Sequence, residues 1–216
     1  MARPYKKVSK VFDTMDVVAA ACAAQRVNGL YIKVPYQLGE ENKRQTNREL
    51  VYQFLEDMSF ITDDDRLLAE DIKSHYQGKT FKILGGGFVT DYDRATMKML
   101  EEETCPEGYN LAVLASVPAS YLKSVARDKA DNRTRFATGG YIGKVGDKVT
   151  LDVEILKCVF SQKWGIFYAT AITKSDEVVF FGFKQELTVG TLMTIKGTVK
   201  SQRDGNVTQL NRVKIV

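Results

Sequence analysis

Residues 149–184 of the chain are VTLDVEILKCVFSQKWGIFYATAITKSDEVVFFGFK, a stretch in which apolar and polar side chains alternate at its start. Every second residue from Val149 to Ile155 is apolar, which is the period of a β-strand with one buried face. Two further strand-like runs, 164–173 and 178–184, follow after short polar segments. The stretch therefore predicts a meander of three antiparallel strands.

The last residues supply two more predicted strands. LMTIKGTVKS (192–201) and VTQLNRVKIV (207–216) flank a polar turn that contains Asp204-Gly205, a dipeptide typical of tight hairpins. An open five-stranded sheet with this many apolar residues would expose too much of them to water, so we expect the sheet to close into a barrel. The order and length of the strands fit the five-stranded OB-fold, with an SH3-like barrel as the nearest alternative.

The residues before the predicted barrel follow a helical pattern. TNRE (46–49) is a capping box, and TDDD (62–65) and TDYD (90–93) place acidic residues in a first helical turn, where the helix dipole favours them. Further helices are expected at 14–26 and 117–130. We therefore predict an α+β protein: a mainly helical region, 1–137, that serves protein interaction, followed by a five-stranded Greek-key OB-fold β-barrel, 138–216, that binds nucleic acid.

The net positive charge of the chain lies in its last third. Residues 139–216 hold 11 Lys and Arg against 7 Asp and Glu, whereas residues 1–138 hold 20 of each, so the last third carries the whole net charge of +4. A basic excess on one small domain indicates a polyanionic partner, although it also suits plain solubility. No apolar run approaches the ~20 residues of a membrane span, and three cysteines without a CxxC pair indicate a reducing compartment.

The sequence contains no pattern that strongly indicates catalysis. The single histidine, His75, is expected near a helix C-terminus and has no nucleophile motif beside it. LGGGF (84–88) lacks the Gly-Lys-Ser/Thr of a phosphate-binding loop. Three consecutive acids, as in 63–65 or 101–103, point about 100° apart on a helix and do not converge on a cation. We expect a non-enzymatic protein without metal or cofactor.

Candidate binding residues lie on the predicted barrel. OB barrels bind single strands by stacking bases on exposed aromatic rings of the second and third strands while Lys and Arg contact the phosphates. Alternation requires that some of the aromatics fill the core instead, and the sequence leaves this alternative open for each. The predicted stacking residues are Trp164, Tyr168 and Phe181, and the predicted phosphate contacts are Lys163, Lys184, Lys196, Lys200, Arg203, Arg212 and Lys214.

The C-terminal ~75 residues also resemble a known family. The pattern is carried by Gly165 and Tyr168, an aromatic third strand with Phe180, Leu187 and Gly190, the run IKGTVK (195–200), and Thr208, Leu210, Arg212 and Lys214. It resembles the small OB domains of phage-encoded and other DNA-replication proteins. The resemblance implies a single-stranded DNA-binding protein of replication or recombination in the cytoplasm of a bacterial host.

The resemblance also sets expectations about partners. Classical bacterial single-strand-binding proteins recruit partners through an acidic tail, whereas this sequence ends in RVKIV, so we expect the helical region to dock replication or recombination proteins. No membrane partner is expected, and self-association stays open. Two alternatives stay open as well: a protein-interaction or structural module of a polymerase or virion complex, and an RNA-binding accessory factor of transcription or translation.

Overall fold

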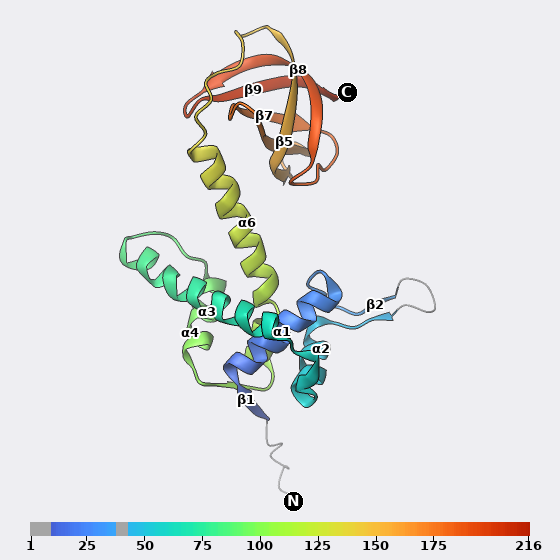
Figure 1. The fold of residues 1–216 in the computed structure, drawn as a ribbon, viewed down its shortest axis with the longest axis vertical. Coiled ribbons are helices and arrows are strands. Elements are labelled where there is room, and N and C mark those ends of the chain that lie inside the picture. The colour runs from blue at the N-terminus through green and yellow to red at the C-terminus, as the bar shows by residue number, and fades with distance from the viewer. Residues whose placement is uncertain (1–9, 38–42) are drawn as a thin grey trace, which may run out of the picture. The chain divides into compact units, whose positions relative to one another are not determined.

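The computed structural model describes residues 10–37 and 43–216 (Figure 1). The protein is α+β, as predicted: helices precede a closed five-stranded barrel. It divides into two compact units, a helical unit that ends at Ser124 and a barrel unit, Val125–Val216. The boundary between these units lies inside helix α6 (Val117–Arg135), whereas the boundary predicted at 138 marks where the helical pattern gives way to strands.

The helical unit is built around one alanine-rich helix, α1 (Thr14–Asn28). All eight residues of Val17–Ala24 are at most 2% exposed, so α1 is central, and its small side chains let neighbouring helices approach closely. The remaining elements of the unit are β1 (Val11–Asp13), β2 (Tyr36–Gln37), β3 (Lys43–Arg44), α2 (Asn47–Glu56), the 3-10 turn η1 (Met58–Phe60), α3 (Asp63–Leu84), α4 (Asp91–Glu101), β4 (Thr104–Pro106) and α5 (Tyr109–Leu114).

The N-terminal caps of two predicted helices also take part in tertiary contacts. Thr62 and Asp65 form a reciprocal capping box at the start of α3, and Thr90 and Asp93 form another at the start of α4. Each aspartate additionally receives a cation from a different helix. The guanidinium of Arg26 donates to both carboxylate oxygens of Asp65, at 3.1 and 2.7 Å, and Lys79 Nζ lies 2.6 Å from Asp93 Oδ1. Each cap therefore starts its own helix and also links that helix to a neighbouring one.

The barrel has the strand order of an OB-fold. Its strands are β5 (Lys148–Ser161), β6 (Ile166–Thr173), β7 (Val178–Phe183), β8 (Leu192–Arg203) and β9 (Val207–Ile215). They close in the order β5-β6-β7-β9-β8, with β7 and β9 parallel and every other neighbouring pair antiparallel. The closure seen in Figure 1 leaves no free sheet edge. Its core is formed by Ile155, Phe181, Ile195, Val199 and Leu210, each at most 2% exposed.

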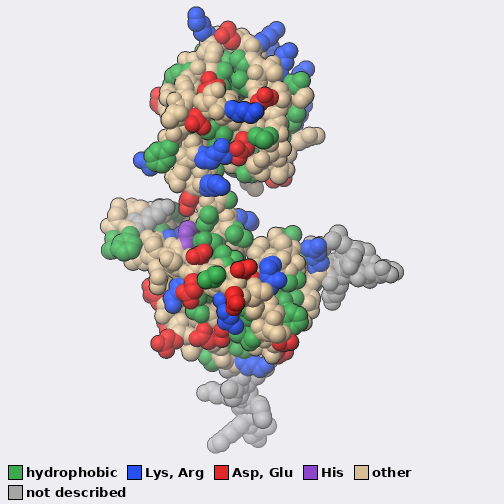
Figure 2. Space-filling view, in the orientation of Figure 1, with side chains coloured by type: hydrophobic (Ala, Val, Ile, Leu, Met, Phe, Trp, Pro, Cys, Tyr) green, Lys and Arg blue, Asp and Glu red, His purple; other side chains and the backbone are tan. Residues whose placement is uncertain are grey.

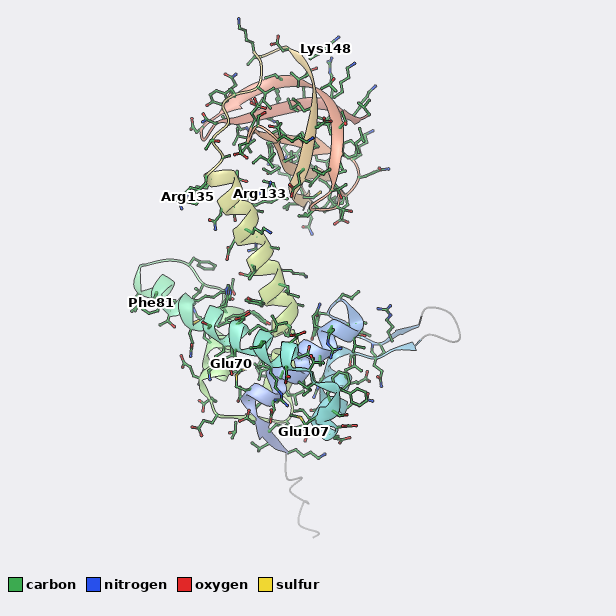
Figure 3. The ribbon with its side chains drawn as sticks, viewed as in Figure 1. Glu70, Phe81, Glu107, Arg133, Arg135 and Lys148 are labelled. Carbon is green, nitrogen blue, oxygen red and sulfur yellow. The ribbon has the colours of Figure 1, made fainter. Side chains whose placement is uncertain are left out.

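The last turns of α6 belong to the barrel unit. A register shift between Ile155 and Lys157 turns Leu156 to the outside of the barrel, where it packs with Ile172 and Ala130 of α6. Arg133, labelled in Figure 3, donates to Glu154 Oε1 at 2.7 Å, and Lys157 pairs with Asp131. These contacts cover an apolar patch on the outer surface that strand alternation does not predict.

The last strand departs from the predicted alternation. The sequence predicts that Leu210, Arg212 and Lys214 share one face and that Ile215 fills the core. In the structure Leu210 is buried in the core whereas Lys214 is exposed, and Ile215, which lies opposite the core residue Ile195 at the end of the strand, is 48% exposed. The reason is a β-bulge, because the pairing of β8 with β9 shifts between Lys196 and Thr198 and inserts Arg212 as an extra residue. An inserted residue exchanges the two faces of the strand that follows.

Candidate nucleic-acid interface

Two aromatic rings stack on the outer surface of β6 and β7. The rings of Tyr168 and Phe180 are nearly parallel, with 9° between their planes and 5.4 Å between their centroids. The guanidinium of Arg203 lies over the Phe180 ring, 4.7 Å from its centroid. We call these three side chains the outer stack.

Strand alternation places the outer stack outside the barrel. Ala169 and Ala171 of β6 and Val179 and Phe181 of β7 point inward and are fully buried, so the side chains between them point outward. The prediction that Phe181 stacks on bases is therefore wrong, because a ring that is 0% exposed in the core cannot contact a ligand. Phe180, which the sequence did not single out as a stacking residue, is the partly exposed aromatic that this strand contributes to the outer stack.

Arg203 is held against the Phe180 ring by a small polar network. Its Nη2 donates to Gln209 Oε1 at 2.6 Å, and the hydroxyl of Ser201 donates to the same oxygen at 3.1 Å. The hydroxyl of Tyr141 donates to the backbone carbonyl of Arg203 at 2.9 Å. A cation fixed at the end of an aromatic stack is well placed to meet the phosphate next to a stacked base.

The order of the strands decides which ring faces are open. Tyr168 belongs to β6 and Arg203 to β8, which lie on opposite sides of β7 in the barrel. They therefore approach the Phe180 ring from opposite sides, and Tyr168, which is partly exposed, ends the stack: in the described ranges no second ring or cation lies over it. Its neighbour on β5 is Val159, which pairs with Tyr168 in register and is 62% exposed. A base can stack on Tyr168 above Val159. Phe180 lies between Tyr168 and Arg203 and holds both in place.

A second aromatic group lies at the turn between β5 and β6. Trp164 is 63% exposed, and Lys163 Nζ lies 5.1 Å from its ring centroid. Close by, Phe160 and Phe167 pair across the strands with centroids 5.0 Å apart, and Phe160 is 51% exposed. The predicted exposure of Trp164 is confirmed. Phe160 was missed, and its only signal in the sequence was its position next to this polar turn.

All seven predicted basic residues are exposed on the barrel unit. Lys184 and Arg212 border a groove of about 460 Å³, Lys196 lies opposite Lys214, and Lys200 is the extra residue of a second bulge in β8. Within the described part of the chain, none of the seven pairs with a carboxylate. Residues 125–216 hold 15 Lys and Arg against 9 Asp and Glu, and Figure 2 shows basic side chains across the visible face of this unit.

The helical unit offers little for catalysis. Burial raises the pKa of Cys22 to about 12 and that of Cys105 to about 11, so neither thiol is a ready nucleophile near neutral pH. His75 was expected near a helix end. It lies inside α3 instead, where its ring makes edge contacts with Tyr76 and Tyr121 at centroid distances of 5.4 and 5.1 Å. Among residues 10–37 and 43–216, no cluster of three His, Cys, Asp or Glu side chains could hold a metal ion.

Comparison of the chain with family models, with curated proteins and with solved structures finds no significant match in any of the three. In the described ranges, no helix combines the length and the apolar character that a bilayer crossing requires. The features that indicate a function are therefore the barrel and the side chains on its outer surface.

Proposed function

We propose that the protein is a non-enzymatic single-stranded DNA-binding protein and that its barrel unit contacts the strand. The observation that carries the proposal is the outer stack, with the partly exposed Tyr168 at one end and Arg203 fixed at the other. Stacking of bases on aromatic rings contributes about 1–3 kcal/mol per base and tolerates any sequence, because every base has an aromatic face.

The charge pattern supports a polynucleotide over a small ligand. Seven exposed cations on one unit, none paired with a carboxylate in the described residues, leave a surface that can contact several anionic groups of a partner. A single strand supplies phosphates at regular intervals together with bases that reach the rings. Duplex DNA fits less well, because its bases are stacked on each other and are not free to stack on Tyr168 or Trp164.

The resemblance of the barrel sequence to phage replication proteins supports a role for this activity in DNA replication or recombination. The helical unit would then dock a protein of the same process. It holds 16 Lys and Arg against 18 Asp and Glu in residues 1–124, which suits a protein better than a second nucleic-acid contact. Exposed apolar residues around the end of α3 support this role: Phe81, Leu84 and Phe88 are each at least 77% exposed. Phe81 is labelled in Figure 3.

The proposal is tested by titrating the full chain into a fluorescein-labelled oligo-dT of about 15 nucleotides and following anisotropy at rising salt. We expect binding at low salt, with log K falling against log salt by roughly 0.7 for each phosphate contact. Absence of binding at low salt, or binding that salt does not affect, would refute the proposal. Competition by oligo-U and by duplex DNA of the same length separates a single-stranded DNA-binding protein from an RNA-binding factor and from a general polyanion binder.

A further inference from the structure

A groove of about 460 Å³ runs along the outer surface of the barrel beside the outer stack. Ile166 of β6, Gly182 of β7 and Val213 of β9 line it, and Lys184 and Arg212 stand at its border. Both cations are exposed. The groove thus combines an apolar floor with two positive charges, which is the composition that a nucleotide requires.

Gly182 keeps this groove open. It pairs with Tyr168 in register, and a Cβ atom added to it would lie 3.0 Å from Ile166 Cδ1 and 3.6 Å from Tyr168 Cε1. Its backbone is not among the left-handed glycines of the chain, so conformation alone does not demand a glycine here. Glycine inside a strand weakens the strand and often marks a place where a ligand approaches closely. The missing side chain leaves room directly beside the Tyr168 ring.

Arg212 reaches the groove at a cost to the backbone. Its φ of 52° lies in the left-handed region, which a side chain with a Cβ disfavours by roughly 1–2 kcal/mol. It is the inserted residue of the β-bulge in β9, and bulges frequently re-aim a side chain next to a binding site. Glycine would fit this backbone better, so the arginine is not explained by the stability of the strand.

We infer, building on the proposed function, that the groove holds one nucleotide of the bound strand. The base lies over Gly182, against Ile166 and the Tyr168 ring, and the adjoining phosphodiester lies between Lys184 and Arg212. The planar guanidinium of Arg212 contacts two phosphate oxygens at once, whereas Lys184 acts as a single point charge. Binding therefore depends on the room above Gly182 as well as on charge.

The inference is tested with two variants of the full chain in the oligo-dT titration. Arg212→Gly removes the guanidinium and relieves the left-handed backbone, so we expect about a tenfold weaker Kd together with an unchanged or higher Tm. Gly182→Ala keeps every charge and places a methyl group in the groove between Ile166 and the Tyr168 ring, and we expect at least a several-fold weaker Kd. Lys174→Ala, which removes one exposed charge from the turn between β6 and β7, is the matched control and should weaken binding less than either variant.

The possible results distinguish a failure of the nucleotide site in the groove from a failure of the proposed function. If the wild-type chain binds oligo-dT and both folded variants bind as tightly as Lys174→Ala, the groove is not a nucleotide site, although the barrel still binds the strand. If the wild-type chain does not bind, the proposed function fails and the inference fails with it. Should Gly182→Ala fail to fold, Ile166→Val in the same chain removes the contacting Cδ1 atom, and Arg212→Gly decides the question independently.

Discussion

Lys196 of β8 and Lys214 of β9 lie directly opposite each other in antiparallel register. Both side chains are exposed. Like charges in this position destabilise a sheet, because opposed side chains are only about 5 Å apart at their Cβ atoms. The pair therefore lowers the stability of the free barrel, and a bound phosphate would relieve the repulsion.

Lys196→Glu should strengthen the barrel and weaken DNA binding. The new carboxylate would face Lys214 and replace a repulsion by an attraction, which is worth roughly 0.2–1 kcal/mol in a cross-strand pair. Urea unfolding measures the stability, and oligo-dT anisotropy measures the affinity. Lys196→Ala is the control: it should fall between wild type and Lys196→Glu in both measurements. A variant that is less stable and binds as tightly as wild type would contradict this account.

Tyr168→Ala and Phe181→Ala should have opposite effects. Tyr168 is partly exposed at the end of the outer stack, so its removal should weaken binding by about 1–3 kcal/mol and leave the fold intact. Phe181 is fully buried in the barrel core, so its truncation should destabilise the barrel by about 3–5 kcal/mol. Circular dichroism and urea unfolding of both variants, with oligo-dT anisotropy of the folded ones, check the two halves of the prediction. Unfolding of Tyr168→Ala would assign that ring to the core.

Trp164 should report the binding of a strand directly. It is the single tryptophan of the chain and is 63% exposed, so a base that stacks on it should quench its fluorescence. Trp164→Ala should change stability by no more than about 0.5 kcal/mol, as is usual for a surface position, and should weaken oligo-dT binding. Loss of folding in this variant would instead favour a barrel whose aromatics serve structure alone. An emission spectrum unaltered by saturating oligo-dT would remove Trp164 from the interface.

The contact between Arg26 and Asp65 should make the helical unit sensitive to acid. Burial raises the pKa of Asp65, but hydrogen bonds from Arg26 and from Thr62 outweigh it and hold the pKa below its ordinary value. The folded pKa is thus below the unfolded one. The stabilisation is complete above the unfolded pKa of about 4 and is lost as the pH falls through the lower, folded pKa.

Asp65→Asn tests this pH dependence. It should destabilise the protein at pH near 7 by about 2 kcal/mol, because a charged hydrogen-bond network and a helix cap are weakened together. The difference from wild type should shrink when urea unfolding is repeated near pH 3, where the wild-type carboxylate is increasingly protonated. Asp64→Asn, at the exposed neighbouring position, should have little effect at either pH. An equal loss from both variants would contradict the special role of Asp65.

Local patterns predicted much of this fold. The threonine caps at Thr46, Thr62 and Thr90 and the alternation of 149–155 depend on interactions within a few residues, and each is present in the structure. The closure of the barrel could be predicted because five apolar-rich strands in an open sheet would expose too much apolar surface to water. The exposure of the seven basic residues followed equally simply, since a charged side chain is rarely buried without a partner.

The details of the site were harder to predict because they depend on tertiary contacts. Alternation separates Val178 and Phe180 from Val179 and Phe181, but both sets are apolar, so it does not tell which set faces the core. Outward Ile172 and Leu156 look like core residues until α6 is seen to cover them. The bulge at Arg212 carries no glycine or proline that would announce it, so simple alternation placed Leu210 on one face with Lys214, although Leu210 fills the core and Lys214 is exposed.

The packing of α6 on the barrel has a practical consequence for isolating the barrel. An expression fragment that starts at 138 would uncover Leu156 and Ile172 and deprive Glu154 and Lys157 of Arg133 and Asp131. Such a fragment should aggregate even though all five strands are present. A fragment that starts at Val125 retains the last turns of α6 over this apolar patch and is the better piece to purify for crystallisation or NMR.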